Sequence, residues 1–358
     1  MPIESTIWEL EEHTKAKHEI LREYLKAWFP IISSQRRGMN YIDGFAGPGI
    51  YSKGEEGSPL IAMRTVLEHV MFRKIAETQI RFHFIEKDVD RAKILRKVIE
   101  ERFPNLPENI KWWVYEGEEF ASTIERALDE LEKEGANMAP SFVFIDPFGF
   151  KGFPLRIIRR ILKYPSCEVL VTFMEGFIRR FAERNEETLN DLFETDEWKK
   201  HLQKETPLVQ LYERQLKEKA GAKYTLSFRM IKLGRTLYYL VFATKHIKGL
   251  EVMKEAMWRV DPRGQYKFGD LAKGQTTLFN LSSKWWYYDA ARLVYQRFAG
   301  KTVSWEDIWK FVIEETPYVY RAGILNKLEN DGKIVRVERE DGKKRRRGSF
   351  KGCIIQFQ

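Results

Sequence analysis

The stretch YIDGFAGPGIY, residues 41–51, contains three glycines, a proline and an alanine directly after an apolar run typical of a buried strand. A loop that only connects two packed elements does not need this composition. Glycines let a ligand approach the backbone closely, and Asp43 places a carboxylate at the end of the strand. A glycine-rich turn alone is weak evidence, so its interpretation depends on the residues further along the chain. The residues that we expect to hold a ligand here are Asp43, Gly44, Phe45, Gly47 and Gly49.

Strand and helix patterns alternate on both sides of this loop. Strand-like apolar runs occupy residues 39–44, 80–86, 110–115, 141–146 and 168–173, and helical spacing occupies residues 13–29, 58–76, 89–103, 120–134 and 155–162. Such alternation predicts crossover connections and a parallel sheet, with ligands bound at the carboxyl ends of the strands. The runs YTLSFRMI (224–231) and TLYYLVFAT (236–244) flank the turn KLGR and predict an antiparallel hairpin that closes the sheet.

Acidic residues stand at the ends of the next two predicted strands. The second strand ends in FIEKD, which places Glu86 where a carboxylate can accept both hydroxyl groups of a ribose. The third ends in YEGEEF, so Glu118 is the candidate for contact with an adenine amino group, with Glu116 and Glu119 as competitors. A single acid at a strand end is commonly a solvated charge. Acids at three successive strand ends beside a glycine loop are much less expected by chance.

The fourth predicted strand ends in FIDPFGF. Asp146 and Pro147 predict a rigid turn, and Phe148 offers a surface on which a planar group can stack. The Asp146 carboxylate, or a nearby carbonyl, can then accept a hydrogen bond from an exocyclic amine and orient it for attack. The competing interpretation is a turn capped by aspartate, with the phenylalanine in the core. We favour the first because the motif ends the strand nearest the expected cleft. The residues expected to act on a substrate are Asp146, Pro147, Phe148 and Gly149.

Together these motifs resemble the Rossmann-like S-adenosylmethionine-dependent methyltransferases. Residues 43–49 are similar to the cofactor loop of that superfamily, Glu86 to its ribose acid and Gly117-Glu118 to its Gly-Asp adenine contact. The motif at 146–149 differs from the Asp-Pro-Pro-Tyr of enzymes that methylate adenine N6. It is closer to the Asp-Pro-Phe-Gly of the tRNA guanine-N2 methyltransferases. The resemblance implies S-adenosylmethionine as cofactor and leaves the target base open.

Segments spread over nearly the whole chain resemble a narrower family, the three-Cys-motif partner proteins (TcmP). That family is described as the partner of a phage-type protein whose three-cysteine motif resembles radical-SAM enzymes. The resemblance therefore implies a protein partner of that kind. The matching segments are YIDGFAGPGIY…GSPLIA, FIDPFGFKGFP, Arg180-Phe181, DLFETDEW (191–198) and YYLVFATKHIKGLEVMKEAMWRVDP (238–262).

Two groups of basic residues have competing interpretations. Residues 176–220 are polar, charged and helical in pattern, which predicts an insertion after the fifth strand. At its start, Arg179 and Arg180 are candidates for binding a phosphate backbone, and salt bridges with Glu175 and Glu183 explain them at least as well. The first predicted helix carries basic residues that fit either a solvated face or the cover that related methyltransferases pack over the cofactor. These residues are His13, Lys15, Lys17 and His18.

The pattern changes again from about residue 284. Two helical patterns, at 303–313 and 318–330, precede the strand KIVRVERE, the basic turn DGKKRRRGSF and the strand KGCIIQFQ, which is the order of a winged-helix module. Within 333–351, nine basic residues stand against three acidic ones, and consecutive cations repel each other without a counter-ion. A basic wing can follow a phosphate backbone while the preceding helix lies in a groove. The expected contacts are Lys343, Lys344, Arg345, Arg346 and Arg347.

Composition limits the classes of protein to which the chain can belong. The 358 residues are 43% apolar and 14% aromatic, typical of a globular chain, and the net charge of +9 permits a nucleic-acid partner without establishing one. Two cysteines exclude a disulfide framework and a cysteine-based zinc site. No apolar run suits a secretory signal or a bilayer span, so we expect a soluble cytoplasmic protein with no membrane partner.

These observations predict an α/β fold with a Rossmann-like methyltransferase-type sheet, parallel with a terminal antiparallel hairpin. We expect this domain to cover residues 1–265, with the helical insertion at about 176–220, followed by a linker at 266–283 and a winged-helix domain at 284–358. The leading hypothesis is a metal-free, S-adenosylmethionine-dependent nucleic-acid methyltransferase. In one alternative, Asp43, Glu86 and Asp146 gather a divalent metal ion for phosphodiester hydrolysis. In the other, the chain is a non-catalytic adaptor that recruits the three-cysteine partner to nucleic acid.

Overall fold

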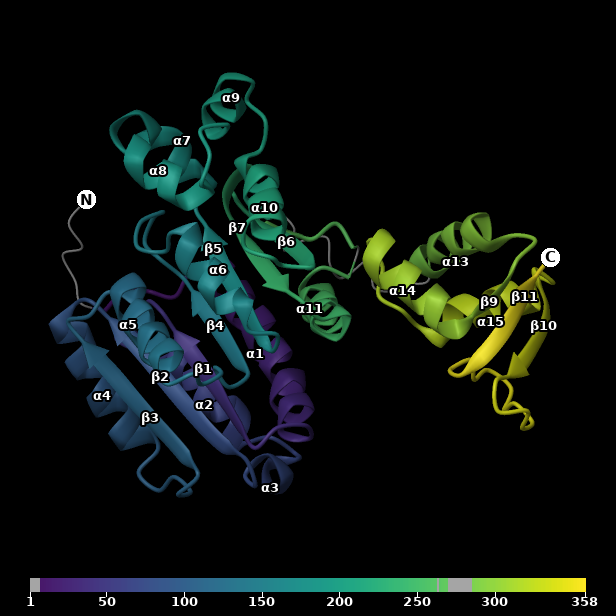
Figure 1. Cartoon of the computed structure of the whole chain (residues 1–358), viewed down its shortest axis with the longest axis horizontal. Helices are drawn as coiled ribbons and strands as arrows, with labels where there is room; N and C mark the ends of the chain where they lie inside the picture. Colours follow the sequence, from purple (N-terminus) through teal and green to yellow (C-terminus); the bar gives the residue numbers. More distant parts are fainter. Residues whose placement is uncertain (1–6, 263, 270–284) are drawn as a thin grey trace. The chain divides into compact units, whose positions relative to one another are not determined.

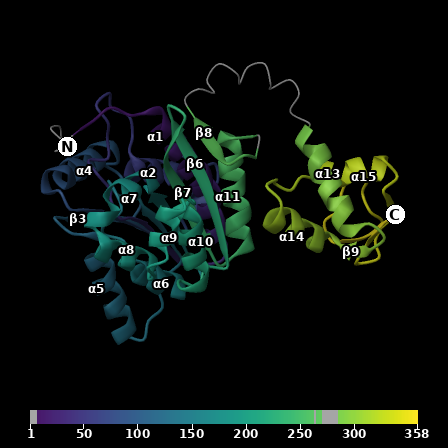
Figure 2. The ribbon, with the colours of Figure 1, turned by 90° about the horizontal axis from the view of Figure 1, so that it is seen from above.

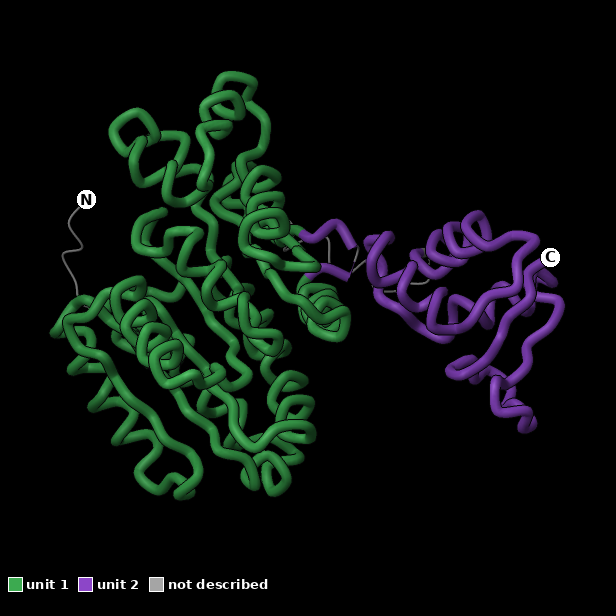
Figure 3. Tube along the Cα trace, viewed as in Figure 1, with its two compact units in different colours: residues 1–260, 267–270 green, residues 261–266, 271–358 purple. Residues whose placement is uncertain are grey.

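The computed structural model describes residues 7–262, 264–269 and 285–358, which form two compact units (Figure 3). Unit 1 contains the described residues up to 260 together with 267–269. Unit 2 contains the described residues of 261–266 and those from 285 to the C-terminus. No helix within the described ranges has the length and apolarity needed to cross a bilayer.

Unit 1 is built around one sheet with the strand order β3-β2-β1-β4-β5-β7-β6-β8 (Figure 1). The five strands from β3 to β5 are mutually parallel, β7 is antiparallel to both β5 and β6, and β8 pairs parallel with β6. The predicted α/β fold, with a largely parallel sheet and an antiparallel hairpin of β6 and β7, is confirmed. The strands are β1 (Gly38–Asp43), β2 (Gln79–Glu86), β3 (Ile110–Glu116), β4 (Ser141–Ile145), β5 (Cys167–Phe173), β6 (Tyr224–Lys232), β7 (Arg235–Thr244) and β8 (Lys267–Gly269).

Helices cover both faces of this sheet. Figure 2 shows α1 and α2 on the opposite side of the sheet from α5 and α6. Helix α1 packs against both α2 and α11, and α6 packs against both α5 and α10. The helices are α1 (Glu12–Ser33), α2 (Ser58–Leu67), α3 (Phe72–Ile75), α4 (Val89–Arg102), α5 (Phe120–Lys133), α6 (Leu155–Lys163), α7 (Glu175–Phe181), the 3₁₀ turn η1 (Ala182–Arg184), α8 (Glu186–Phe193), α9 (Trp198–Gln203), α10 (Leu208–Glu218) and α11 (Ile247–Val260).

Burial along the strands follows from this layering. Every residue of β4 and β5 is buried, as expected for central strands whose two faces are both covered by helices. In the edge strand β3, buried positions are separated by exposed or half-buried ones. The central strands therefore read as continuous apolar runs, and they carry the loops that form the candidate site at their carboxyl ends.

The helix predicted at 58–76 is interrupted. Helix α2 ends at Leu67 and α3 begins at Phe72. Between them, the Nδ1 atom of His69 accepts the Met71 N–H over 3.0 Å, and its Nε2 atom lies 2.9 Å from the carbonyl oxygen of Lys26. That carbonyl has no helical donor, because the residue four positions later is Pro30, which lacks an N–H. His69 satisfies both groups, so the polar turn replaces a continuous helix.

The described part of unit 2 combines three helices with a three-stranded sheet in the order β10-β11-β9. Both predicted helices begin later than expected. Residues 302–304 pair with β11 instead, and Ser304 caps the next helix through a reciprocal pair of hydrogen bonds with Asp307. The elements are α13 (Trp285–Phe298), β9 (Thr302–Ser304), α14 (Trp305–Glu315), α15 (Ala322–Asn330), β10 (Ile334–Arg339) and β11 (Cys353–Phe357).

Candidate functional site

The glycine loop after β1 is held in a compact shape. Gly47 and Gly49 have φ angles of +62° and +76°, a region that favours glycine. A Cβ atom on Gly49 would lie 2.5 Å from Leu95 Cδ1 and 2.8 Å from Leu60 Cδ1, whereas one on Gly47 would meet no atom within 4 Å. The Gly57 N–H closes the loop by donating to the Gly49 carbonyl over 2.7 Å. The loop backbone is therefore packed against the protein at Gly49 and open at Gly47.

Asp43 lies beneath this loop. Its carboxylate is fully buried and accepts the Phe45 N–H over 3.3 Å and the Tyr41 hydroxyl over 3.4 Å. The pKa of Asp43 is raised to about 7, chiefly by burial; hydrogen bonds from Ser58 and the Phe45 N–H oppose the shift, and the negative charge of Asp146 adds to it. Asp43 thus supports the loop from below.

Glu86, at the end of β2, is tied to the same loop. Its carboxylate accepts the Gly47 N–H over 2.8 Å and the Asp88 N–H over 2.8 Å. The Glu86 carbonyl oxygen also accepts the Gly117 N–H, which brings the loop after β3 alongside. A carboxylate has about four acceptor positions, so two remain for a ligand.

The acids after β3 are all engaged with basic side chains. Glu118 accepts the Thr123 hydroxyl over 2.6 Å and pairs with Arg126. The competing acids pair as well: Glu116 lies 3.9 Å from Lys93, and Glu119 lies 2.5 Å from Lys87. Any ligand contact by Glu118 therefore competes with Arg126.

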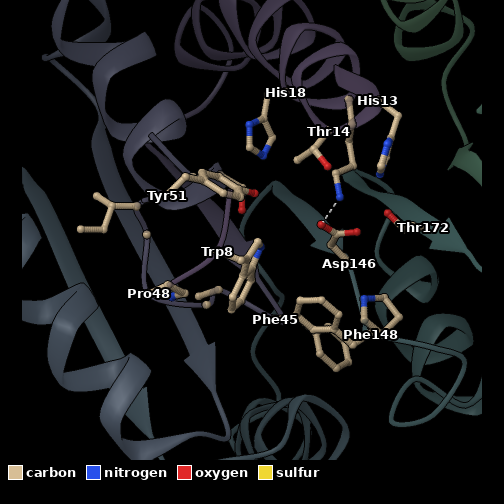
Figure 4. Close-up of a pocket in the computed structure, with 18 of the residues that line it drawn as sticks. Trp8, His13, Thr14, His18, Phe45, Pro48, Tyr51, Asp146, Phe148 and Thr172 are labelled. Atoms are coloured by element: carbon tan, nitrogen blue, oxygen red, sulfur yellow. Dashed lines mark hydrogen bonds and ion pairs between the residues drawn. The ribbon is translucent and has the colours of Figure 1, made fainter. Parts of the chain in front are cut away.

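A cavity of about 150 Å³ lies where the glycine loop meets the end of β4 (Figure 4). The loop residues 45–51 form one wall, and the turn 146–148 forms another. The side chain of Phe148 is 68% exposed and packs edge-on against Trp8, with ring centroids 5.2 Å apart. The Arg91 guanidinium lies 5.0 Å from the Trp8 ring. Small-ligand sites usually have volumes of about 300 Å³ or more, so Trp8 leaves only part of such a site open.

Asp146 is the member of the three predicted carboxylates that lines this cavity. Within the described residues, neither Asp43 nor Glu86 is part of the cavity lining. Their carboxylates accept backbone N–H groups of the loop instead, as any buried carboxylate must find donors. The metal-binding alternative placed Asp43, Glu86 and Asp146 around one ion, and this cavity does not bring the three together. No group of three or more histidine, cysteine, aspartate or glutamate side chains suited to a metal ion occurs in the parts of the chain that are described.

Helix α1 forms another wall of the cavity. The sequence left open whether the basic residues of this helix are exposed or cover the site. Lys17 and His18 are buried, and both line the cavity. Lys17 forms an ion pair with Asp146, and their side chains are 8% and 22% exposed. Burial lowers the pKa of His18 to about 3, with the Lys17 charge as the next cause, so its imidazole is neutral at neutral pH. The sequence contained a signal for the burial of Lys17, because Lys17 lies four residues before Leu21 and therefore on the same side of the helix.

The two arginines of α7 differ in their surroundings. Arg179 pairs with the buried Glu175 over 2.8 Å and donates to the Thr206 carbonyl over 2.5 Å, so it links α7 to the turn before α10. Arg180 is exposed, forms no ion pair with the described residues and lies 6.0 Å from the Phe181 ring. The structure therefore leaves Arg180 available for an anion and places Arg179 in a structural ion pair.

The basic turn between β10 and β11 likewise contains one cation held in an ion pair and others that are exposed. Arg345 pairs with Glu329 of α15, and its guanidinium lies 5.0 Å from the Phe350 ring. Lys343 is exposed, and its nearest acid is Asp341 at 4.0 Å. Three further cations, Lys344, Arg346 and Arg347, are exposed and form no ion pair with any described residue. Arg345 is thus an anchor for the turn, and the other cations point into solvent.

Comparisons with known proteins give structural likeness only. No protein-family model and no curated protein matches the chain. A solved structure from Legionella pneumophila, assigned to the family model DUF519, matches with 14% identity and a TM-score of 0.36 over 63% of this chain and 84% of that one. A DUF574 family protein from Streptomyces avermitilis matches with 12% identity and a TM-score of 0.31 over 63% and 83%. The plantazolicin methyltransferase BpumL, solved with SAH, matches with 9% identity and a TM-score of 0.32 over 65% and 86%. All these TM-scores are below 0.5, so the strand order and register of unit 1 alone carry the fold assignment.

Proposed function

We propose that this protein is an S-adenosylmethionine-dependent methyltransferase that acts on nucleic acid. The observation that supports this most strongly is that the glycine loop and the Asp146 turn line one cavity. They meet because β1 and β4 are neighbours, with Asp43 paired to Phe144. An acceptor for an exocyclic amine therefore lies beside a loop whose backbone is open to a ligand.

The residues present fit the cofactor in part. The open side of Gly47 leaves room along the loop for the methionine portion. Glu86 retains acceptor positions for the ribose hydroxyls. Glu118 can accept a hydrogen bond from the adenine amino group once Arg126 moves away from it. S-adenosylmethionine, when bound, supplies an activated methyl group. We infer that Trp8, which packs against Phe148, has to move to make room for the rest of the molecule.

The chain's own residues then position the acceptor. Pro147 fixes the turn, the exposed ring of Phe148 offers a stacking surface, and Asp146 accepts a hydrogen bond from the amine. A base in a duplex has to flip out to reach this site. Gly149, with a φ angle of +132°, lets the chain turn away directly after the phenylalanine.

We assign nucleic-acid binding to unit 2, interpreted as a winged-helix domain. Its order of helix, strand, two helices and two strands around the turn at 340–352 is the order of that module. The solvent-facing cations Lys344, Arg346 and Arg347 suit a phosphate backbone, and Arg180 of unit 1 adds another candidate contact. The three-cysteine partner is proposed on the resemblance of the quoted sequence segments alone.

One observation favours the non-catalytic adaptor as a second candidate. Lys17 already neutralises Asp146, so the carboxylate has a partner before any substrate arrives. An adaptor would keep this ion pair permanently. It would bind nucleic acid through unit 2 without needing Asp146.

The test is transfer of a labelled methyl group from S-adenosylmethionine to single-stranded DNA and RNA by the full chain. We expect label in the nucleic acid, and we expect Asp146→Ala to lower the transfer rate by about 100-fold or more without changing nucleic-acid affinity. Absence of transfer by the wild-type chain, or an unchanged rate in Asp146→Ala, rejects methylation. Intact nucleic-acid binding in that case supports the adaptor.

A further inference from the structure

We propose that Lys17 is a positioning residue that selects the acceptor base. The selected bases are those whose Watson–Crick edge, the edge by which flipped bases are read, places an exocyclic amine next to an unprotonated ring nitrogen, namely adenine and cytosine, in preference to guanine. The inference rests on the proposed methyl transfer at Asp146. It addresses the question that the Asp-Pro-Phe-Gly motif leaves open, which is the identity of the target base.

The first step is the fixed contact between the two side chains. The Lys17 Nζ atom donates to the Oδ2 atom of Asp146, and Figure 4 shows this bond inside the cavity. The Lys17 side chain is only 8% exposed, so the ion pair is poorly screened by water. The ammonium also lies 5.6 Å from the centre of the Tyr238 ring, which gives it a second favourable contact on the same wall. Lys17 is therefore held where it is.

The second step is what this contact does to the carboxylate. A free carboxylate accepts two parallel N–H groups, and guanine offers such a pair in its N1–H and amino groups. Lys17 takes one acceptor position of Oδ2, so Oδ1 is the oxygen left fully open to a substrate. Beside it stands an ammonium group with further protons to donate. The site therefore presents an acceptor next to a donor, which is the wrong pattern for that edge of guanine.

The complementary pattern belongs to bases with an amine next to a ring acceptor on the Watson–Crick edge. Adenine presents its N6 amine beside N1, and cytosine presents its N4 amine beside N3. In either base the amine donates to Asp146 and the ring nitrogen accepts from Lys17. The amine is then held at the position where the proposed methyl transfer occurs.

A further polar atom in the cavity points to a ligand. The Thr172 Oγ1 atom is buried and has no hydrogen-bond partner among the described residues. Thr172 lines the cavity and lies beside Asp146 (Figure 4). A buried hydroxyl normally has a partner. A base seated against Asp146 would provide one, because the hydroxyl can either donate or accept.

The experiment measures base preference with the full chain, S-adenosylmethionine and single-stranded oligonucleotides that contain adenine, cytosine or guanine as the only base with an amine. Methylated nucleosides are quantified by mass spectrometry as kcat/KM for each base. We expect adenine or cytosine to exceed guanine by about 100-fold, and the separate adenine and cytosine arms show which of the two is used. A discrimination of this size corresponds to one or two well-placed hydrogen bonds.

The variants Lys17→Met and Lys17→Arg then test the cause. Lys17→Met is expected to lower the preference over guanine by about 10-fold or more, and Lys17→Arg, which keeps the donor, to preserve it. An equal loss for all bases would show a merely structural role and overturn the inference. Preference of the wild-type chain for guanine would also overturn it, and this readout needs no variant to fold. Failure of the wild-type chain to methylate any base would instead reject the proposed function.

Discussion

The Gly47 N–H donates to the Glu86 carboxylate over 2.8 Å, and this bond joins the glycine loop after β1 to the end of β2. Glu86 accepts a second backbone N–H, from Asp88, over the same distance. One side chain therefore fixes two chain segments, and it is also the side chain that we propose to bind a ribose. Its structural and ligand-binding roles can be separated by substitution.

Glu86→Ala is expected to lower the free energy of unfolding by about 1–3 kcal/mol, because two backbone donors lose their acceptor. It should also weaken S-adenosylmethionine binding by about 10-fold or more. Glu86→Gln keeps one acceptor oxygen, so it should satisfy one of the two N–H groups and lose about half as much stability while also losing affinity. Chemical denaturation and calorimetric titration measure the two effects. Affinity within a factor of two of wild type in both variants would remove Glu86 from the binding site.

The two loop glycines should differ in their sensitivity to alanine. Gly47→Ala places a Cβ in open space, so only the left-handed backbone is penalised, by about 1–2 kcal/mol. Gly49→Ala carries the same penalty and in addition forces the Cβ against Leu60 and Leu95, for which overpacking costs about 1–3 kcal/mol more. Denaturant unfolding of the matched pair tests this order. Equal losses would mean that the loop is not packed against α2 and α4 as described.

The buried carboxyl of Asp43 should make stability depend on pH. Its pKa is raised from an ordinary 3.8 to about 7, so between these values the folded chain keeps a proton that the unfolded chain has lost. The stabilising contribution is therefore complete below about pH 4, falls as pH rises to 7, and is constant above. Relative to Asp43→Asn, which cannot ionise, the wild-type chain should lose about 4 kcal/mol over that range. Unfolding titrations at several pH values measure it, and parallel curves for the two proteins would contradict the raised pKa.

The basic turn of unit 2 should separate into anchoring and binding residues. Replacing Lys344, Arg346 and Arg347 together by alanine should reduce the slope of log affinity against log salt by about 2–3 for duplex DNA, with unfolding unchanged. Arg345→Ala is the matched control. It breaks the ion pair with Glu329 and should destabilise the unit by about 1 kcal/mol or more while changing the slope by at most about one. A triple variant with an unaltered slope would exclude phosphate contact by the turn.

Trp8 should oppose ligand entry. Its ring packs between Phe148 and Arg91, and aromatic and cation–π contacts of this kind contribute about 0.5–1.5 kcal/mol each. Trp8→Ala should therefore tighten S-adenosylmethionine binding by about 3- to 10-fold with little change in melting temperature. Trp8→Phe, which keeps an aromatic ring, should stay near wild type. Weaker binding in Trp8→Ala would instead make Trp8 part of the ligand wall.

The fold was predictable because its signals are local. Each central strand reads as a short apolar run, and the glycine loop, Glu86 and the Asp146 turn all lie at strand ends, where parallel topology brings them to one edge. The break at His69 was not visible in the same way. It depends on a carbonyl freed by Pro30, which lies 39 residues earlier in the chain.

The composition of the cavity was less predictable, because it depends on contacts between distant segments. Lys17 and Asp146 are 129 residues apart in the chain, and no local pattern pairs them. The same limit applies to the cations: Arg179 and Arg345 look like their neighbours in sequence, yet each is held by a carboxylate that only the fold brings close. Charge patterns located the basic segments but did not show which cations within them are held by a carboxylate.

The cofactor assignment is tested most directly by a crystal structure of the full chain with S-adenosylhomocysteine. We expect one molecule per chain, with its amino-acid portion along the loop at Gly47, its ribose hydroxyls on Glu86 and its sulfur facing the Asp146 turn. A chain that binds no S-adenosylhomocysteine, or binds it away from this loop, would contradict the assignment.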